Sequence, residues 1–245
     1  MFRSWGRRFG TTRRPFLFYT APVHFLRCVL AEWALVRPRL LRTRLGPGLL
    51  LLGAVLAWLG SRGADPIAVA LHAGALGGVL GAAFAAGSEA DRAALQVALT
   101  HPTTPLALAC GRWLAAVLPA AGLSLACTIA VSWHPGAALA GIAAAAAVAG
   151  AALAAVLALG NGAALVLFPC VALAGAVAPE RLVGVADPGF VRLAVASALE
   201  LGPALWRYRD VATGDAGAIL HAAAWAGLGV VLASGFAGRR ARHAR

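Results

Sequence analysis

Of the 245 residues in this chain, 61% are hydrophobic and 12% are charged, and the mean hydropathy is +0.81. These values exclude an ordinary soluble domain, in which about a quarter of the residues are charged. All 21 basic residues are arginine, and the absence of lysine excludes a P-loop, whose lysine binds nucleotide phosphates. We therefore expect an all-α polytopic membrane protein that is not its own conventional ATPase.

The net charge of +12 would by itself suggest a nucleic-acid partner, but the positions of the arginines argue against one. Ten arginines precede Leu45 and four lie in the last eight residues, flanking the apolar runs. The positive-inside rule predicts such flanks in the cytoplasm. We expect both termini to be cytoplasmic, in a bacterial inner membrane, and no nucleic acid to be bound.

Residues 1–44 form a basic cytoplasmic segment with Glu32 as its one acid. Within it, Phe16 to Val36 is rich in aromatic and aliphatic residues but is interrupted by Pro22, Arg27 and Glu32, so it is too polar to span. We expect an interfacial helix, with its arginines at the anionic headgroups of the lipid bilayer. The alternative is a disordered basic tail.

Six apolar runs predict a six-span transmembrane domain over residues 45–238, followed by a basic tail at 239–245. The runs are Leu45 to Gly60, Pro66 to Gly87, Arg112 to Trp133, Gly136 to Gly160, Gly162 to Ala178, and Ala216 to Gly238. A crossing takes about 20 residues, and the first run reaches that length only by including Leu40 and Leu41. Asn161-Gly162 predicts a tight turn between the fourth and fifth runs. If these two runs do not form a complete hairpin, five spans is the alternative.

The charge of the connecting segments supports an even number of spans. The termini carry +9 and +4, whereas the two outer segments, 61–65 and 179–215, carry 0 and −1. The fourth run is almost pure alanine and glycine, which predicts a span buried among its neighbours. Inside the runs, His72 and His221 are the plausible buried titratable residues, with either a packing role or contact with a substrate.

A polar stretch, Ser88 to Arg112, separates the second and third runs. Ser88 and Asp91 match a capping box, which predicts a helix start. The residues Ala94, Leu95, Ala98 and Leu99 recur at helical spacing and form one apolar face. Pro102 and Pro105 end the helix. We expect an amphipathic helix on the membrane surface, able to transmit force to both adjacent spans.

This stretch resembles a motif of the permease subunits of type-2 ABC transporters, and covers about a tenth of the chain. The family has a cytoplasmic helix of the form Glu-x-x-x-Gly-Thr-Leu-Glu-x-Leu-Leu-x-x-Pro between spans two and three, followed by Gly-Lys or Gly-Arg. The matching residues are Glu89, Leu95, Leu99, Pro102, Gly111 and Arg112. The chain departs from the motif with Ala93 and Ala94 in place of Gly-Thr, and with Gln96 in place of Glu.

The resemblance implies that the helix is a coupling helix which docks on a separate ATP-binding-cassette subunit. Its candidate contact residues are Ser88, Glu89, Asp91, Arg92, Leu95, Gln96, Leu99 and Pro102. It also implies a second permease copy or a homologue as partner. ATP and Mg would bind to the partner ATPase, and this chain would hold no cofactor.

The segment from Pro179 to Asp215 is 37 residues long, more than a connection needs. We expect short amphipathic helices at the outer interface, anchored by Trp206 and Tyr208. The resemblance implies a re-entrant element that closes the substrate exit, with Phe190, Leu193, Trp206 and Tyr208 as outer gate candidates. A plain anchored loop is the alternative.

The pattern does not favour an enzyme, because it lacks a nucleophile elbow, an HExxH motif and a glycine-rich phosphate loop. The four cysteines lack the spacing of a zinc site, so no metal is expected. We expect an ABC permease that exports an amphipathic or lipid-like substrate. The alternatives are a haem-export permease of cytochrome c maturation, whose Lys-x-x-x-His-Trp pattern is missing after Pro105, and a non-transporting membrane scaffold subunit. A membrane enzyme acting on polyprenyl lipid ranks third, with Asp187, Glu200 and Asp210 as its outer acids.

Overall fold

The computed structural model of the chain describes residues 21–42, 45–86, 104–160, 162–176 and 202–242. These residues fold into helices joined by short turns, without a strand among them. The helices are α1 (Ala21–Arg42), α2 (Leu45–Ser61), α3 (Pro66–Ala86), α5 (Pro105–Val131), α6 (Pro135–Leu159), α7 (Gly162–Ala176), α10 (Leu205–Tyr208), the 3₁₀ helix η2 (Arg209–Thr213) and α11 (Ala216–Arg242).

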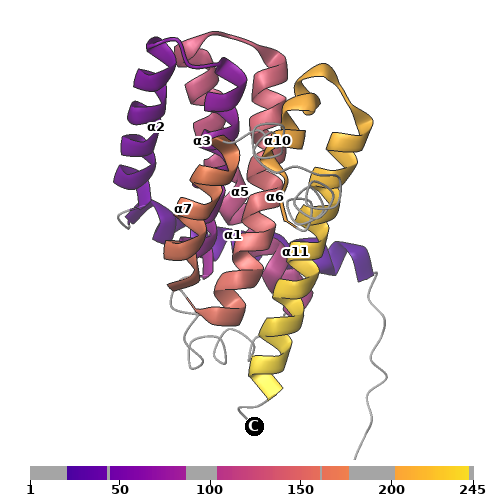
Figure 1. The fold of residues 1–245 in the computed structure, drawn as a ribbon. Coiled ribbons are helices and arrows are strands. Elements are labelled where there is room, and N and C mark those ends of the chain that lie inside the picture. Colours follow the sequence, from indigo (N-terminus) through magenta and orange to yellow (C-terminus); the bar gives the residue numbers. More distant parts are fainter. Residues whose placement is uncertain (1–20, 43–44, 87–103, 161, 177–201, 243–245) are drawn as a thin grey trace, which may run out of the picture.

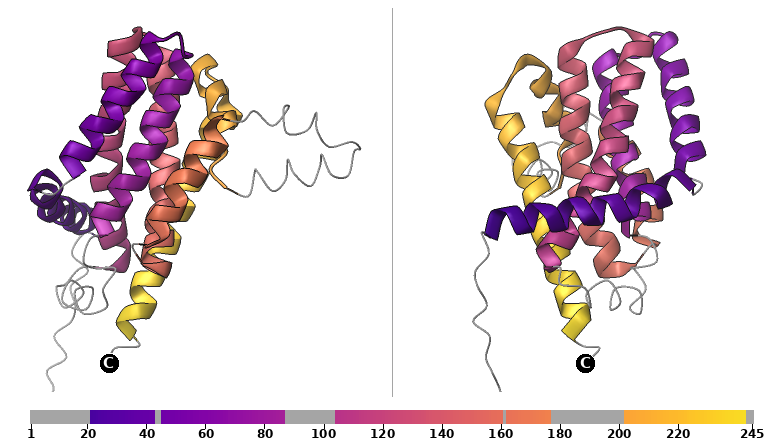
Figure 2. Two further views of the ribbon diagram at one scale, coloured as in Figure 1. Left: turned by 60° about the vertical axis from the view of Figure 1, so that its left-hand side comes forward. Right: turned by 180° about the vertical axis from the view of Figure 1, so that it is seen from behind.

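The centre of the molecule is a bundle of α3, α5, α6 and α11, with α2 and α7 on its flanks (Figure 1). Helix α1 lies crosswise to the bundle near the end at which α11 finishes (Figure 2). We call this end, which holds α1, the last turn of α3 and the first turns of α5, the α1 end. The opposite end, which holds α10, η2 and the α2–α3 turn, is called the α10 end.

Four of the described helices are long and apolar enough to cross a membrane, namely Pro66–Ala86, Pro105–Val131, Pro135–Leu159 and Ala216–Arg239. The chain is thus supported as a multi-pass α-helical membrane protein. Six complete crossings are not supported, because α2 has only 17 residues and α7 has only 15. At the rise of an α-helix they extend about 23–26 Å, less than the hydrocarbon core of about 30 Å.

Helix α6 is buried among its neighbours, as its alanine and glycine content predicts. It packs against α3 on one side and α11 on the other. Where α6 crosses α11, Gly150 faces Gly229, and a Cβ atom added at Gly229 would overlap the Gly150 backbone. Small side chains therefore allow a separation between these helices that larger ones would prevent.

A helix, α1, lies in the segment that was predicted to be interfacial and extends beyond its predicted end at Val36. It runs from Ala21 to Arg42, so Leu40 and Leu41 belong to α1 and do not lengthen α2. Its bundle-facing residues include Val29 and Val36, whereas Val23, Leu26 and Leu30, on an adjacent side of the helix, are about half exposed. Apolar residues on two sides are what a helix needs if it is to pack on a bundle and also meet lipid.

Helix α5 begins seven residues before the run that starts at Arg112. The Thr104 side chain accepts a hydrogen bond from the Ala107 backbone N–H at 3.1 Å, and Pro105 occupies the first helical turn. Both features are typical of a helix start. Arg112 consequently lies about two turns inside α5 instead of at its beginning. The break after α6 agrees with the predicted turn, since α6 ends at Leu159 and α7 begins at Gly162.

Candidate functional site

A buried ion pair joins α1 to the bundle. The Arg112 Nη2 atom of α5 lies 3.4 Å from the Glu32 Oε2 atom of α1, and both side chains are 5% exposed. The Arg112 Nη1 atom also donates a hydrogen bond of 3.1 Å to the carbonyl oxygen of Ala85, in the last turn of α3. One guanidinium of α5 therefore contacts two other helices, α1 and α3, because its planar fork of donors can serve two acceptors at once.

The residue before Arg112 explains how α1 comes so close. A Cβ atom added at Gly111 would lie 2.5 Å from the Glu32 Cβ atom and 2.9 Å from the carbonyl oxygen of Val29. Any larger residue would push α1 away from α5. In the Gly111-Arg112 pair, the glycine permits helix contact and the arginine supplies the charge at that contact.

The ion pair contributes more to fixing the position of α1 than to the free energy of unfolding. Burying both charges costs desolvation energy, so the pair as a whole adds little stability over an apolar contact of equal size. Loss of one partner is different, because it leaves a single charge in an apolar interior. The pair therefore holds α1 in one register against the ends of α3 and α5.

The connection between α3 and α5 starts beside this ion pair and finishes about two helical turns before Arg112. Ala85 precedes the last residue of α3 by one position, and Arg112 lies in the first part of α5. The predicted coupling helix belongs to this connection. Its candidate residues, Ser88, Glu89, Asp91, Arg92, Leu95, Gln96, Leu99 and Pro102, lie outside the described residues.

At the α10 end, two of the predicted residues meet. The rings of Tyr208 in α10 and His221 in α11 have centroids 5.7 Å apart and are tilted by 52°. Tyr208, predicted as an outer gate residue, is fully buried, and His221, predicted for the pathway, is half-buried. Burial raises the pKa of the Tyr208 phenol, which is already protonated at neutral pH without this shift.

The other candidates are separate from this contact or beyond the described ranges. The His72 Nδ1 atom lies 2.7 Å from the carbonyl oxygen of Ala68 in the same helix, so that nitrogen is satisfied within α3. Trp206 lies in α10 and is half-buried. Phe190 and Leu193 lie outside the described residues. The pathway and gate assignments remain predictions.

A second ion pair, between Asp65 and Arg209, joins the α2–α3 turn to η2, and both side chains are substantially exposed. The Asp65 Oδ1 atom also accepts a hydrogen bond of 3.1 Å from the Ile67 backbone N–H and so caps α3.

We expect the two roles of Asp65 to separate by substitution. Asp65→Asn keeps an acceptor for the cap and loses only the exposed ion pair, so it should cost less than about 1 kcal/mol. Asp65→Ala loses both and should cost about 1 kcal/mol more. Thermal unfolding of the purified protein at low and high salt measures both, and equal losses in the two variants would contradict the cap.

The Glu32–Arg112 ion pair was not predicted from the sequence. Glu32 was interpreted as an interruption of the interfacial helix, and Arg112 as the head of a span. A usable signal was present, since Glu32 is the one acid among the first 44 residues and lies at helical spacing between Val29 and Val36. An acid on the apolar face of a helix requires a buried partner.

The described residues contain no group of three or more side chains that could hold a metal ion. All four cysteines are free thiols. No known protein family, curated protein or solved structure matches the chain. Function is therefore inferred from the sequence motif and from the geometry at the α1 end.

Proposed function

We propose that this chain is the permease subunit of an ABC transporter. The observation that carries the proposal is the Glu32–Arg112 ion pair, which ties the crossing helix α1 to the two helices that flank the predicted coupling helix. A permease subunit that is moved by a separate ATPase needs rigid contacts between its helices at the place where the ATPase docks. The ion pair, with its additional bond to the carbonyl oxygen of Ala85, is such an attachment.

In this proposal, an ATP-binding-cassette ATPase docks on residues 88–102 and carries ATP and Mg. Closure of the ATPase subunits pushes on this segment, and α1, α3 and α5 move together because Arg112 of α5 contacts both α1 and α3. Helix α1 is the second element, besides residues 88–102, that transmits the force of the ATPase to the spans. Its exposed residues Val23, Leu26 and Leu30 lie in the membrane interface and guide the movement.

The proposed topology has six membrane segments and both termini in the cytoplasm of a bacterial inner membrane. The four long helices cross completely, while α2 and α7, being shorter, cross by local thinning of the bilayer or end within it. The α1 end faces the cytoplasm, in agreement with the arginines near both termini. The α10 end faces outward.

The proposed substrate is amphipathic or lipid-like and is exported. The described interior of the bundle is made mainly of alanine, glycine, valine and leucine, a lining that does not suit a hydrophilic ion. Two permease copies, or this chain and a homologue, enclose the pathway. His72 and His221 are the proposed polar contacts along it.

The test is to purify the chain from its native membranes and identify what accompanies it. We expect a nucleotide-binding subunit in fixed stoichiometry. A monomer without ATPase activity would contradict the proposal and favour a scaffold subunit.

Charge reversal in the coupling segment then tests the docking site. In vesicles containing the complex, Glu89→Arg and Arg92→Glu should each lower transport at least tenfold while ATP hydrolysis continues, because force no longer reaches the spans. The matched control is Arg62→Glu, which reverses an exposed charge in the α2–α3 turn at the opposite end. Unchanged transport in both Glu89→Arg and Arg92→Glu would remove the coupling assignment.

A further inference from the structure

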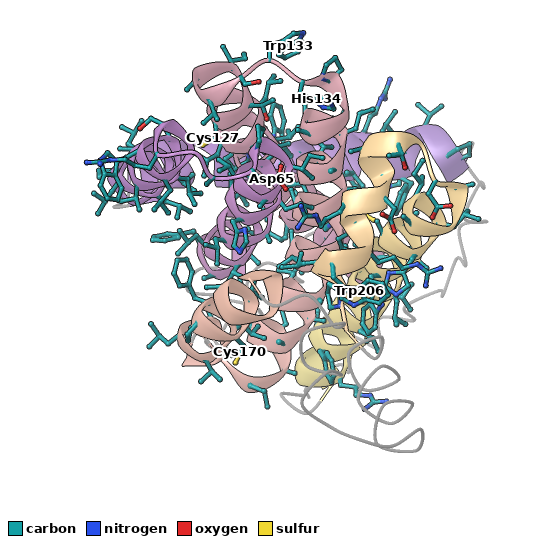
Figure 3. All side chains as sticks on the ribbon, turned by 45° about the horizontal axis from the view of Figure 1, so that its top comes forward. Asp65, Cys127, Trp133, His134, Cys170 and Trp206 are labelled. Atoms are coloured by element: carbon teal, nitrogen blue, oxygen red, sulfur yellow. The ribbon has the colours of Figure 1, made fainter. Side chains whose placement is uncertain are left out.

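An open groove lies between α2 and α5 on the outside of the bundle. Its volume is about 260 Å³. In the view onto the α10 end, Cys127 lies on the side of the bundle that carries α2, well apart from Cys170 of α7 (Figure 3). Most of the residues that line the groove are small, namely Gly53, Ala54 and Ala57 of α2, and Ala126, Cys127 and Ala130 of α5.

The contacts between the two helices explain why the groove exists. A Cβ atom added at Gly60 would overlap the Val131 side chain, and one added at Gly53 would lie 2.8 Å from the Leu123 Cδ1 atom. The two helices therefore touch through these glycines. The alanines that lie beside the contacts are too short to fill the space next to them, so packing within this chain leaves the groove open.

The lining determines the chemistry of the occupant. Its one polar side chain, the thiol of Cys127, donates a hydrogen bond to the carbonyl oxygen of Gly53, with 3.8 Å between the sulfur and the oxygen. The groove thus offers no unpaired polar side chain and suits an apolar group. An apolar cavity of about 150 Å³ in another protein holds benzene, so this groove accepts a longer alkyl group. It is too small for a helix, which is about 10–12 Å across.

The surroundings of the groove identify where that alkyl group comes from. Helix α5 is long and apolar enough to cross the membrane, and Leu50 and Ile129, beside the groove, are 75% and 61% exposed. The groove is therefore continuous with a surface that faces lipid. Trp58 and Trp133, next to its end nearest α10, are also exposed. Exposed tryptophans lie at headgroup depth, so the groove begins where acyl chains begin.

We propose that the α2–α5 groove is a binding site for one acyl chain of a phospholipid in the membrane leaflet at the α10 end. The chain supplies the van der Waals contacts that the alanines are too short to make. It also holds α2, which has only 17 residues, against the long helix α5. The site does not depend on the transport function proposed above.

The experiment uses the full-length protein in phospholipid vesicles that contain phosphatidylglycerol with a diazirine halfway along one acyl chain. Light releases nitrogen from the diazirine, and the resulting carbene inserts into a nearby bond of the protein. Mass spectrometry of proteolytic fragments then locates the label. We expect more label on the groove residues of α2 and α5 than on the exposed face of α11 around Ala224, which meets lipid without a recorded groove.

Filling the groove provides the specific test. Ala126→Leu and Ala54→Leu, on opposite walls, should each lower the label in the groove about fivefold, because leucine takes the place of the chain. Both alanines are exposed, so the variants should fold, and unchanged label on α11 would show that they do. The matched control, Ala224→Leu, should leave the label in the groove unchanged.

Three results would overturn the proposal. The first is label in the groove no greater than on α11, which would mean that the groove meets only passing lipid. The second is undiminished label in both Ala126→Leu and Ala54→Leu. The third is protection of the groove from label in a protein that is dimeric until the groove is filled, which would assign the groove to a second copy of the chain.

Discussion

Replacing Glu32 by glutamine, or Arg112 by glutamine, is expected to destabilise the protein by about 3–5 kcal/mol, because each change leaves one buried charge without its partner. For a chain of this size the loss corresponds to a fall in melting temperature on the order of 10 °C. Thermal unfolding of the detergent-purified variants, followed by the loss of monodisperse protein, measures the effect.

A double variant distinguishes charge from packing. Glu32→Met combined with Arg112→Met removes both charges and keeps most of the volume, so it should be far more stable than either glutamine variant. Asp210→Asn is the control for loss of an exposed carboxylate and should change little. If either glutamine variant melted with the wild type, α1 would not be held by this ion pair.

Gly229→Leu is expected to destabilise the protein as well, although less than the loss of one ion-pair partner. Its Cβ atom would overlap the backbone of Gly150, so α6 and α11 would have to separate along their crossing. Overpacking of this kind costs about 1–3 kcal/mol and sometimes more, and backbone cannot move aside as a flexible side chain can. Chemical or thermal denaturation of the variant in detergent should show this loss.

The matched control lies two residues away on the same helix. Gly227 is exposed, and a Cβ atom added there would meet nothing within 4 Å. Gly227→Leu should therefore be as stable as the wild type or more stable, since leucine is a better helix former than glycine. Equal damage by the two leucines would show that hydrophobic bulk, and not the α6–α11 contact, is responsible.

Local patterns predicted much of the helical architecture. The apolar runs correspond to helices, and the alanine- and glycine-rich run is the buried α6, because a membrane restricts a spanning segment to a hydrogen-bonded helix. Helix ends were predicted less well. Arg112 was predicted as the first residue of the third apolar run, but α5 begins at the Thr104-Pro105 cap and includes it.

The candidate site was predicted only in part. The Gly111-Arg112 pair was singled out through its motif, but its partner Glu32 is 80 residues away from Arg112 and belongs to a helix that crosses the bundle. No local period relates the two residues. The meeting of Tyr208 with His221 likewise depends on the path of the chain between α10 and α11.

By itself, the sequence determined that this is a helical membrane protein with arginine-rich ends, because hydropathy and charge act on each segment independently of its neighbours. The tertiary structure alone decided which buried charge neutralises which, where Gly229 meets Gly150, and where Tyr208 meets His221. Each of these depends on how closely distant segments approach one another. That distance is set by the packing of the whole bundle, to which every helix contributes.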